Sequence, residues 1–402
     1  MAAAAAATCG GRVLLIEKMP RAGRKMAITG KGRCNVTSAD DIPDIIRHIV
    51  GNGRFLNSAI RAFDNADVMR FFEDLGVPLK IERGNRVFPE SDRAADVVDG
   101  MLRHLYDLGV EIRTRAAVTG LLIEDGAVCG VRLGAHAELG DAVILATGGA
   151  SYPATGSTGE GYALARAAGH SIVPVFPALV PLIVAEAWVR ELQGLSLRNV
   201  RATLCYTGKK EQEFFGEMLF THFGVTGPII LQLSRRASEL FMQGAERLSL
   251  HLNLKPALTH EVLCARIARD FTQYARKQLH NGMVDLLPRR LIDPVLRAAG
   301  LSPEMPVGQV SAKKRALLAQ SLQSFSMTIV GTRPIAEAIV TAGGVATREI
   351  DPRTMASKVV RNLYIAGELA DIDAYTGGYN LQAAFSMGHA AGCYSVWNLE
   401  GV

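Results

Sequence analysis

Short apolar runs alternate with amphipathic stretches through the first 170 residues of the chain. Residues 12–17 and 141–149 are apolar runs of the kind found in buried parallel strands. Residues 66–76 and 92–108 carry apolar positions at helical spacing, and each stretch ends at or just before a glycine. Strands and helices that alternate in this way predict an α/β domain built on a parallel sheet.

The pattern changes after residue 172. Residues 174–181 contain three prolines and predict a linker. Residues 199–206, 213–221 and 246–254 read as strands, the first two alternating in antiparallel fashion and joined by a turn at Thr207-Gly208. Helical patterns at residues 259–300 and 313–322 follow, and strands are expected at residues 324–330 and 337–341. The middle of the chain therefore predicts a second, β-rich region with a helical portion.

The last sixty residues carry a strand, a carboxylate, a glycine pair and a helix in close succession. Residues 363–366 predict a buried strand, and a small-residue helix is expected from about residue 379 to residue 396. Gly367 would let the backbone approach a ligand, and Glu368 and Asp371 would offer carboxylates to its hydroxyl groups. A glycine turn at a helix start presents free N–H groups to an electron-rich ligand. This arrangement suits a flavin held by its ribityl chain, with further contacts expected at Gly377, Gly378, Tyr379, Asn380 and Leu381.

The N-terminal residues predict part of a dinucleotide-binding unit. Residues 1–9 are mostly alanine and predict a helix, which Gly10-Gly11 ends before the strand at residues 12–17. Glu17 would take the ribose hydroxyls of an adenosine, and a G-x-G-x-x-G turn is then expected about 20 residues earlier, before Met1. We therefore expect that the start codon was assigned too late, or alternatively that the chain is genuinely truncated.

Residues 18–37 combine three glycines with basic side chains and predict a ligand-binding loop, a solvated basic turn being the alternative. Arg24 and Lys25 could meet a pyrophosphate, and Arg33, Cys34 and Asn35 could reach the flavin ring. No second cysteine lies near Cys34, which disfavours dithiol–disulfide exchange. The remaining predicted cofactor contacts are Lys18, Gly32, Ala117, Val118, Thr147, Gly148 and Gly149.

Composition narrows the function classes. At 402 residues the chain exceeds the size of a single core, so two or three domains are expected. A net charge of +5 is mild, we expect it to be spread out, and it gives no argument for a nucleic-acid partner. The six cysteines form no close pair, which makes a disulfide framework or a metal site unexpected and favours a cytoplasmic location. Prolines interrupt the most apolar stretch and no charged n-region precedes the alanines, so neither a membrane span nor a signal peptide is expected. The sequence leaves the oligomeric state open.

Four blocks, at residues 23–35, 146–162, 220–228 and 367–382, resemble the BaiN/YhiN-like flavoproteins, and the similarity spans nearly the whole chain. That family is described as NAD(P)/FAD-dependent oxidoreductases, with labels such as bile-acid reductase and aminoacetone oxidase. The resemblance implies FAD as cofactor, NAD(P)H as a candidate electron donor and a small-molecule substrate. It also implies a Rossmann-like FAD-binding domain of the two-dinucleotide-binding type, interrupted by a β-barrel and a small helical domain. We assign these domains to residues 1–172 and 342–402, to residues 173–255 and 323–341, and to residues 256–322.

The predicted chemistry belongs to the flavin, which would pass a hydride between a nicotinamide or other electron partner and a small organic substrate. His222 is the best candidate for a general acid or base because its ordinary pKa suits proton transfer near neutrality, although a structural histidine bonded to backbone is the alternative. Tyr152 and Arg333 are weaker candidates on the substrate side. Two other functions stay open: a fumarate-reductase-like or ketosteroid-dehydrogenase-like flavoenzyme, and a truncated, flavin-free protein without catalytic activity.

Overall fold

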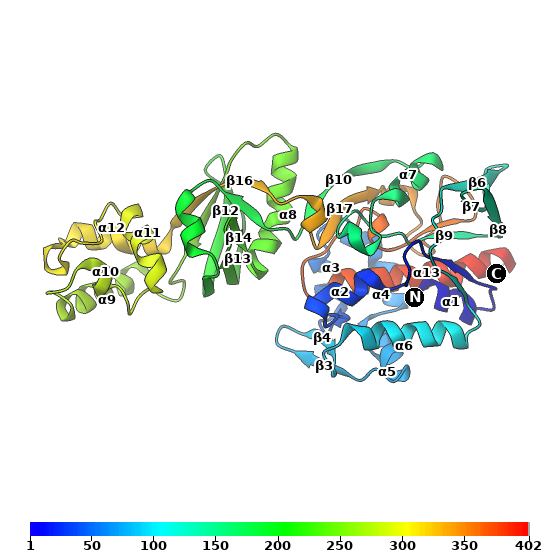
Figure 1. Ribbon diagram of the computed structural model, residues 1–402, viewed down its shortest axis with the longest axis horizontal. Helices are drawn as coiled ribbons and strands as arrows, with labels where there is room; N and C mark the ends of the chain where they lie inside the picture. The colour runs from blue at the N-terminus through cyan, green and yellow to red at the C-terminus, as the bar shows by residue number, and fades with distance from the viewer. Residues whose placement is uncertain (401–402) are drawn as a thin grey trace. The chain divides into compact units, whose positions relative to one another are not determined.

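The computed structural model describes residues 1–400, which form two compact units (Figure 1). Unit 1 contains the described residues of the segments Met1–Pro177 and Ile335–Val402, and unit 2 is Ala178–Pro334. The chain therefore leaves unit 1, completes unit 2 and returns to unit 1. This discontinuous organisation agrees with the predicted mixed α/β fold, whereas the predicted border between a barrel domain and a helical domain stays a prediction.

Unit 1 is built on short strands, and two pairs of them, which precede the predicted ligand contacts, are parallel. Strand β1 (Leu14–Ile16) pairs in parallel with β5 (Glu111–Arg113), and β9 (Val143–Leu145) pairs in parallel with β18 (Leu363–Ile365). The other strands of unit 1 are β2 (Thr37–Ser38), β3 (Leu79–Glu82), β4 (Arg86–Pro89), β6 (Gly120–Glu124), β7 (Ala127–Leu133), β8 (His136–Leu139), β10 (Ile172–Ala178) and β17 (Val340–Val345). The α-helices of unit 1 are α1 (Ala2–Thr8), α2 (Arg24–Gly32), α3 (Ile42–His48), α4 (Asn57–Ala62), α5 (Asn65–Asp74), α6 (Ala94–Asp107), α7 (Glu160–Ala167) and α13 (Tyr379–Glu400).

Helix α13 is the central helix of unit 1, and its small residues explain how closely its neighbour packs. A Cβ added to Gly392 would lie 2.3 Å from the carbonyl oxygen of Ala2, so only glycine lets α1 lie this close. The apolar face of α13 also carries Ala383, Met387 and Ala391, which are buried in one hydrophobic cluster with strand β18. This packing places the start of α13 beside the ends of the central strands.

Unit 2 contains a closed six-stranded barrel with the strand order β11-β14-β13-β12-β15-β16. Its strands are β11 (Leu182–Val184), β12 (Ser196–Tyr206), β13 (Lys209–Phe220), β14 (Gly224–Thr226), β15 (Leu248–Asn253) and β16 (Phe325–Thr332). Its α-helices are α8 (Pro228–Met242), α9 (His260–Gln273), α10 (Leu279–Gly282), α11 (Arg289–Ala298) and α12 (Ala312–Gln323). One hydrophobic cluster includes Leu250 and Phe325 of the barrel together with Leu291 and Leu318 of the helices, so the two parts share a core.

Three local predictions were wrong. Residues 174–181 were expected to be a linker, and the boundary between the units does fall there, after Pro177, but Ile172–Ala178 forms strand β10, which pairs with β17 and accommodates two prolines in a two-stranded sheet. The strand expected at residues 337–341 begins later, because Ile335–Glu337 is a short 3₁₀ turn and β17 starts at Val340. The loop expected at residues 18–37 contains helix α2, which breaks at Thr29, Gly30 and Lys31.

Candidate functional site

The candidate site of unit 1 lies at the carboxyl ends of the parallel pair β9 and β18. Ile365 is in register with Leu145, and the amide of Ala366 donates to the carbonyl of Leu145 over 3.0 Å. The two chains therefore leave the sheet together, one as Thr147–Gly149 and the other as Gly367 and Glu368. Ligands of open α/β sheets bind at such carboxyl ends, and here the predicted contacts Thr147, Gly148, Gly149, Gly367 and Glu368 meet at one edge.

Glu368 is the centre of a polar cluster at this edge. Its Oε2 lies 2.6 Å from Lys25 Nζ, and its Oε1 accepts from the Thr341 amide over 2.7 Å and from Ser151 Oγ over 3.2 Å. Lys25 Nζ also donates to Ser151 Oγ over 2.7 Å. The predicted basic segment and the predicted acidic turn are thus joined directly, and the carboxylate takes its donors from three separate segments.

Gly149 is required for this cluster. A Cβ at that position would lie 2.5 Å from Thr341 Oγ1 and 2.8 Å from Glu368 Oε1. Thr341 in turn accepts a hydrogen bond from the amide of Ala150 over 2.8 Å. Close packing of polar groups around a residue without a side chain explains why the Ala-Thr-Gly-Gly sequence follows strand β9.

Lys18 and Arg24 attach the N-terminal segment to the loop that precedes α7. Lys18 Nζ contacts Thr158 Oγ1 and Glu160 Oε2, each over 2.6 Å, and Arg24 Nη2 donates to the carbonyl of Ala154 over 3.2 Å. Gly156 is needed in this loop, because a Cβ there would lie 2.9 Å from Met19 Cγ. The contacts bring Lys18 and Arg24, the second of which was predicted to meet a pyrophosphate, to the loop that follows Thr147–Gly149.

Glu17 follows strand β1 and lies beside the segment that follows β5. Its amide donates to the carbonyl of Arg113 and its carbonyl accepts from the amide of Ala116. Its carboxylate has one protein donor in the described residues, the Met19 amide at 2.8 Å, so acceptor capacity remains for hydroxyl groups. The predicted contacts Ala117 and Val118 begin directly after Ala116, next to this carboxylate.

In the basic segment at residues 18–37, one buried side-chain oxygen has no hydrogen-bond partner in the described residues, one arginine is ion-paired and one cysteine is buried. Asn35 Oδ1 is buried and has no hydrogen-bond partner in the part of the chain that the structure describes. Arg33 is paired with Glu82 and Asp92, which raise its pKa, and its guanidinium lies 4.0 Å from the ring centroid of Phe88. Cys34 is fully buried, and burial raises the pKa of its thiol to about 11, so it is uncharged near neutrality. Gly32, at the end of α2, is exposed and adopts a positive φ of 83°.

The Gly377-Gly378 turn packs against backbone. A Cβ on Gly378 would lie 2.3 Å from the carbonyl carbon and oxygen of Thr37, and Gly378 has a φ of 99°. Only glycine fits both constraints, so the turn brings the start of α13 against the strand that follows Asn35. The orphaned amide oxygen and the helix start therefore lie in one neighbourhood.

The first side chains of α13 bind protein groups. Tyr379 is buried, stacks on His48 with ring centroids 4.4 Å apart, and donates its hydroxyl to Asp40 Oδ2 over 2.5 Å. Asn380 bridges the loop before the helix by accepting from the Ala374 amide and donating to the Ala374 carbonyl. Leu381 packs on a hydrophobic cluster, and Asp371 accepts from Asn52 Nδ2 over 2.9 Å. These contacts fix the backbone before and at the start of α13.

Sequence reasoning missed three residues that hold this site together. Ser151 and Thr341 supply donors to Glu368, and buried Gln382 joins α13 to β2 by accepting from Thr37 Oγ1 over 2.5 Å. Ser151 and Gln382 stand inside blocks that carried the family resemblance, which was the available signal. Thr341 had no such signal, because it stands in a strand without a recognisable motif.

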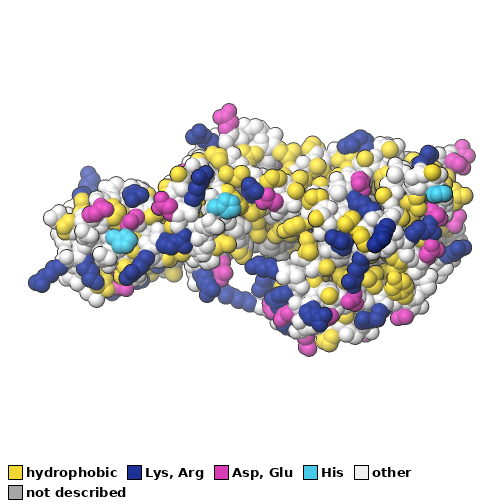
Figure 2. Space-filling model, in the orientation of Figure 1, with side chains coloured by type: hydrophobic (Ala, Val, Ile, Leu, Met, Phe, Trp, Pro, Cys, Tyr) yellow, Lys and Arg dark blue, Asp and Glu magenta, His cyan; other side chains and the backbone are white. Residues whose placement is uncertain are grey.

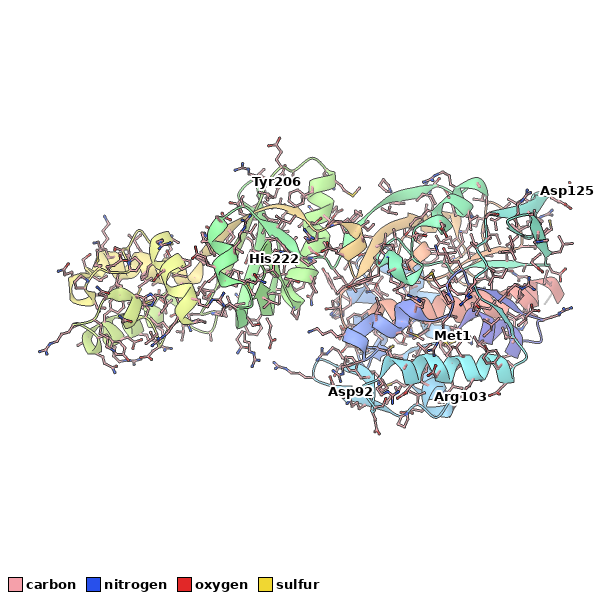
Figure 3. The ribbon with its side chains drawn as sticks, in the orientation of Figure 1. Met1, Asp92, Arg103, Asp125, Tyr206 and His222 are labelled. Atoms are coloured by element: carbon pink, nitrogen blue, oxygen red, sulfur yellow. The ribbon has the colours of Figure 1, made fainter. Side chains whose placement is uncertain are left out.

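His222 and Arg333 belong to unit 2, and the site above is formed by unit 1. His222 is exposed on the barrel (Figure 3), where its ring meets Phe223 edge-on, and it makes no hydrogen bond with any described residue. The alternative of a histidine bonded to backbone therefore does not describe it. The Arg333 guanidinium lies 4.8 Å from the ring centroid of Phe223. Tyr152, in unit 1, is 36% exposed and precedes the short 3₁₀ turn Pro153–Thr155.

A protein-family model described as HI0933-like protein Rossmann domain matches residues 1–394 of the chain. A 3-dehydro-bile acid delta(4,6)-reductase of Clostridium scindens is 31% identical over 98% of this chain and 95% of its own length. A ribosomal RNA dihydrouridine synthase of Escherichia coli is 29% identical over 96% of this chain and 92% of its own length. Both alignments extend over unit 1 and unit 2 together.

Among solved structures, a 3-ketosteroid delta1-dehydrogenase from Sterolibacterium denitrificans superposes with a TM-score of 0.51 at 12% identity. The superposition covers 99% of this chain and 97% of that one. At this identity the likeness concerns the fold, and it extends over both units. No helix in residues 1–400 is long and apolar enough to cross a membrane.

Proposed function

The chain belongs to the HI0933-like Rossmann family, and from this premise we propose that it reduces a carbon–carbon double bond conjugated to a carbonyl group, using FAD. The protein is a flavoprotein oxidoreductase with a Rossmann-type FAD-binding fold. The structural observation that supports FAD as cofactor is the presence of Glu17, the Thr147–Gly149 turn and the Glu368 cluster on one unit. These are the groups expected around a dinucleotide that is held at both ends.

The described residues fit FAD in two respects. Glu17 keeps free acceptor capacity where an adenosine ribose would offer hydroxyl groups. Asn35 Oδ1 is a buried acceptor without a donor, and burying such an atom costs about 1–3 kcal/mol unless a bound group supplies an N–H. FAD would supply such a donor from its ring, and when bound it supplies two-electron chemistry by accepting and delivering a hydride.

The polar residues would hold and orient the cofactor without reacting themselves. Lys25 is already paired with Glu368, so the pair would present one hydrogen-bonded, nearly neutral surface to the ribityl chain. The amides at the Gly377-Gly378 turn and the start of α13 would favour negative charge that develops nearby. We keep His222 as the proposed proton donor, because it is exposed and free of hydrogen bonds with the described residues. We also keep Tyr152 and Arg333 as weaker proposals on the substrate side.

The double-bond chemistry is supported by what the two relatives have in common. One is named for reducing a 3-oxo compound with double bonds at positions 4 and 6, and the other for turning uridine into dihydrouridine. Both names describe the addition of two hydrogens to an alkene conjugated to a carbonyl group. A hydride adds readily to the far carbon of such an alkene, and a proton donor completes the reaction.

A small 3-oxo compound is our first candidate substrate, and uridine in RNA is the second. The composition gave no argument for a nucleic-acid partner, and RNA is kept as a second candidate because one relative is named for acting on RNA. The charge is also unevenly distributed: unit 2 has 20 Lys and Arg against 12 Asp and Glu, while the whole chain has 44 against 39. Figure 2 shows Lys and Arg side chains on the visible face of unit 2. A basic unit favours a phosphate-bearing partner.

The test starts from the purified protein. Its visible spectrum should show bound oxidised flavin, and heating should release FAD and no FMN. Anaerobic reduction with NADH or NADPH tests the proposed electron donor directly. The reduced protein is then mixed with a 3-oxo-Δ4 steroid acid or with a uridine-containing RNA, and return of the oxidised flavin spectrum identifies the substrate class. The proposal would be contradicted if neither compound reoxidised the reduced flavin, while a saturated alcohol or an amine reduced the oxidised flavin.

His222→Asn tests the proposed proton donor. A general acid contributes about 10²–10⁴-fold, so turnover should fall by about that factor while the flavin-to-protein ratio stays unchanged. His251→Asn, at a half-buried histidine of unit 2 that contacts Ser324 Oγ, is the control and should keep full turnover. Equal turnover of the two variants would remove His222 from the mechanism and leave the flavin assignment standing.

A further inference from the structure

Unit 2 contains a cavity of about 290 Å³ where the barrel meets the helical segment. The first residues of β12, Leu254 and Lys255 after β15, and the start of α11 form its walls. Its volume is just below the range of about 300–1,000 Å³ of pockets that hold drug-sized ligands. It can therefore hold a small molecule or one end of a larger one.

Most of the cavity wall is apolar. Leu197, Leu254, Leu287 and Leu291 line it, and each of them is also part of the hydrophobic core of unit 2. None of the lining residues is aromatic. Nucleic-acid bases bind largely by stacking on aromatic rings, so this wall suits an aliphatic body better than a base.

Two cations interrupt the apolar wall, and neither has a carboxylate partner in the described residues. Arg198 is exposed at the edge of the cavity, and Lys255 is half-buried within it. Lys255 makes hydrogen bonds through its backbone, whose amide donates to Asn253 Oδ1 over 2.9 Å and whose carbonyl accepts from the Leu258 amide over 3.0 Å, and its side chain makes none with the described residues. Burial lowers the pKa of Lys255, and the nearby Arg266 lowers it further.

The side chain of Lys255 is half-buried and has no acceptor in the described residues, and removing such a charge from water is costly unless a counter-charge replaces the water. Arg266 adds positive charge near Lys255, although its own Nε lies 3.5 Å from Asp270 Oδ2. An anion would supply the partner that Lys255 and Arg198 lack, and the apolar wall beside them would suit an aliphatic body attached to that anion.

We propose that this cavity binds a small organic anion, a carboxylate on an aliphatic body, with Lys255 and Arg198 holding the carboxylate. The site lies wholly within unit 2 and does not depend on the proposed reaction. The ligand should carry a single negative charge at one end and a compact apolar group at the other. A purely hydrophilic anion would therefore not be the preferred ligand.

The experiment uses octanoate as the probe and octanamide as its neutral counterpart, with binding to the full-length protein measured by titration calorimetry. Octanoate should bind and raise the unfolding temperature, and octanamide should bind at least tenfold more weakly. Lys255→Met keeps the apolar stem and removes the charge, so octanoate affinity should fall about ten- to hundredfold. Lys313→Met is the matched control, because Lys313 is exposed on α12 and does not line the cavity; it should bind octanoate like the parent.

Lys255→Met also gives a readout that does not need a ligand. If Lys255 carries an uncompensated charge, the variant should unfold at a temperature equal to or above that of the parent in anion-free buffer. Equal binding of octanoate and octanamide, or unchanged octanoate binding in Lys255→Met, would overturn the proposal. So would inorganic phosphate or a short uridylate oligomer that binds more tightly than octanoate and loses its binding in the same variant.

Discussion

Glu368 gives the sharpest test of the candidate site, because its carboxylate joins three segments that are distant in sequence. Glu368→Ala would leave Lys25 Nζ without its charged partner and the Thr341 amide without an acceptor. Each unsatisfied donor costs about 1–3 kcal/mol when buried. The side chains of Lys25 and Glu368 are 23% and 18% exposed, so solvent screens part of the ion pair. We expect the free energy of unfolding to fall by about 2–4 kcal/mol.

Glu368→Gln separates the charge from the hydrogen bonds. Its amide oxygen can still accept from Thr341 and Ser151, so we expect a loss of about 1 kcal/mol. Arg70→Ala is the control, since the Arg70–Asp67 pair at 3.0 Å is exposed and such pairs contribute about 0–1 kcal/mol.

Urea unfolding followed by circular dichroism gives the stability of each variant, and the flavin-to-protein ratio after purification gives cofactor retention. Glu368→Ala should lose flavin as well as stability, while Arg70→Ala should keep both. If Glu368→Ala and Arg70→Ala unfold at the same urea concentration and hold the same amount of flavin, the cluster has no role in this site.

Three further outcomes are expected. Gly378→Ala should lower the free energy of unfolding by more than about 3 kcal/mol, because the added Cβ would overlap the backbone of Thr37. Gly10→Ala is the control: Gly10 has a similar φ of 93° and no atom within 4 Å of the added Cβ, so the change should cost about 1–2 kcal/mol from backbone strain alone. Equal urea midpoints for the two variants would refute this. Cys34 should resist N-ethylmaleimide at pH near 7 and react in urea, since burial raises the pKa of its thiol to about 11. Mass spectrometry locates the label, and rapid labelling of Cys34 in the folded protein would contradict its burial. Burial lowers the pKa of His170 in the folded protein. Stability should therefore fall as the pH drops below about 6.5, because the histidine takes up a proton more readily in the unfolded chain than in the folded protein. His170→Gln should flatten the pH dependence of the urea midpoint.

Much of the fold could be predicted from local pattern. The apolar run at residues 363–366 is strand β18, the alanine-rich start is α1, and the alternating stretches around Thr207-Gly208 are β12 and β13. In each case the local signal and the tertiary environment agree. Residues 174–181 show the opposite case, because their prolines indicated a linker while pairing with β17 made most of the segment a strand.

The candidate site, too, could be predicted from the sequence only in part. The sequence by itself determined which segments carry the chemistry, since carboxylates, glycine pairs and basic residues at fixed places after strands are local features. Only the tertiary structure decided that Glu368 pairs with Lys25, 343 positions away, and that Thr341 and Ser151 complete its shell. It also decided that Gly378 is required by Thr37 backbone and that Cys34 is buried away from solvent. Such contacts depend on how strands and helices dock across the whole chain, and docking is set by close packing between distant segments, which no local pattern of residue types encodes.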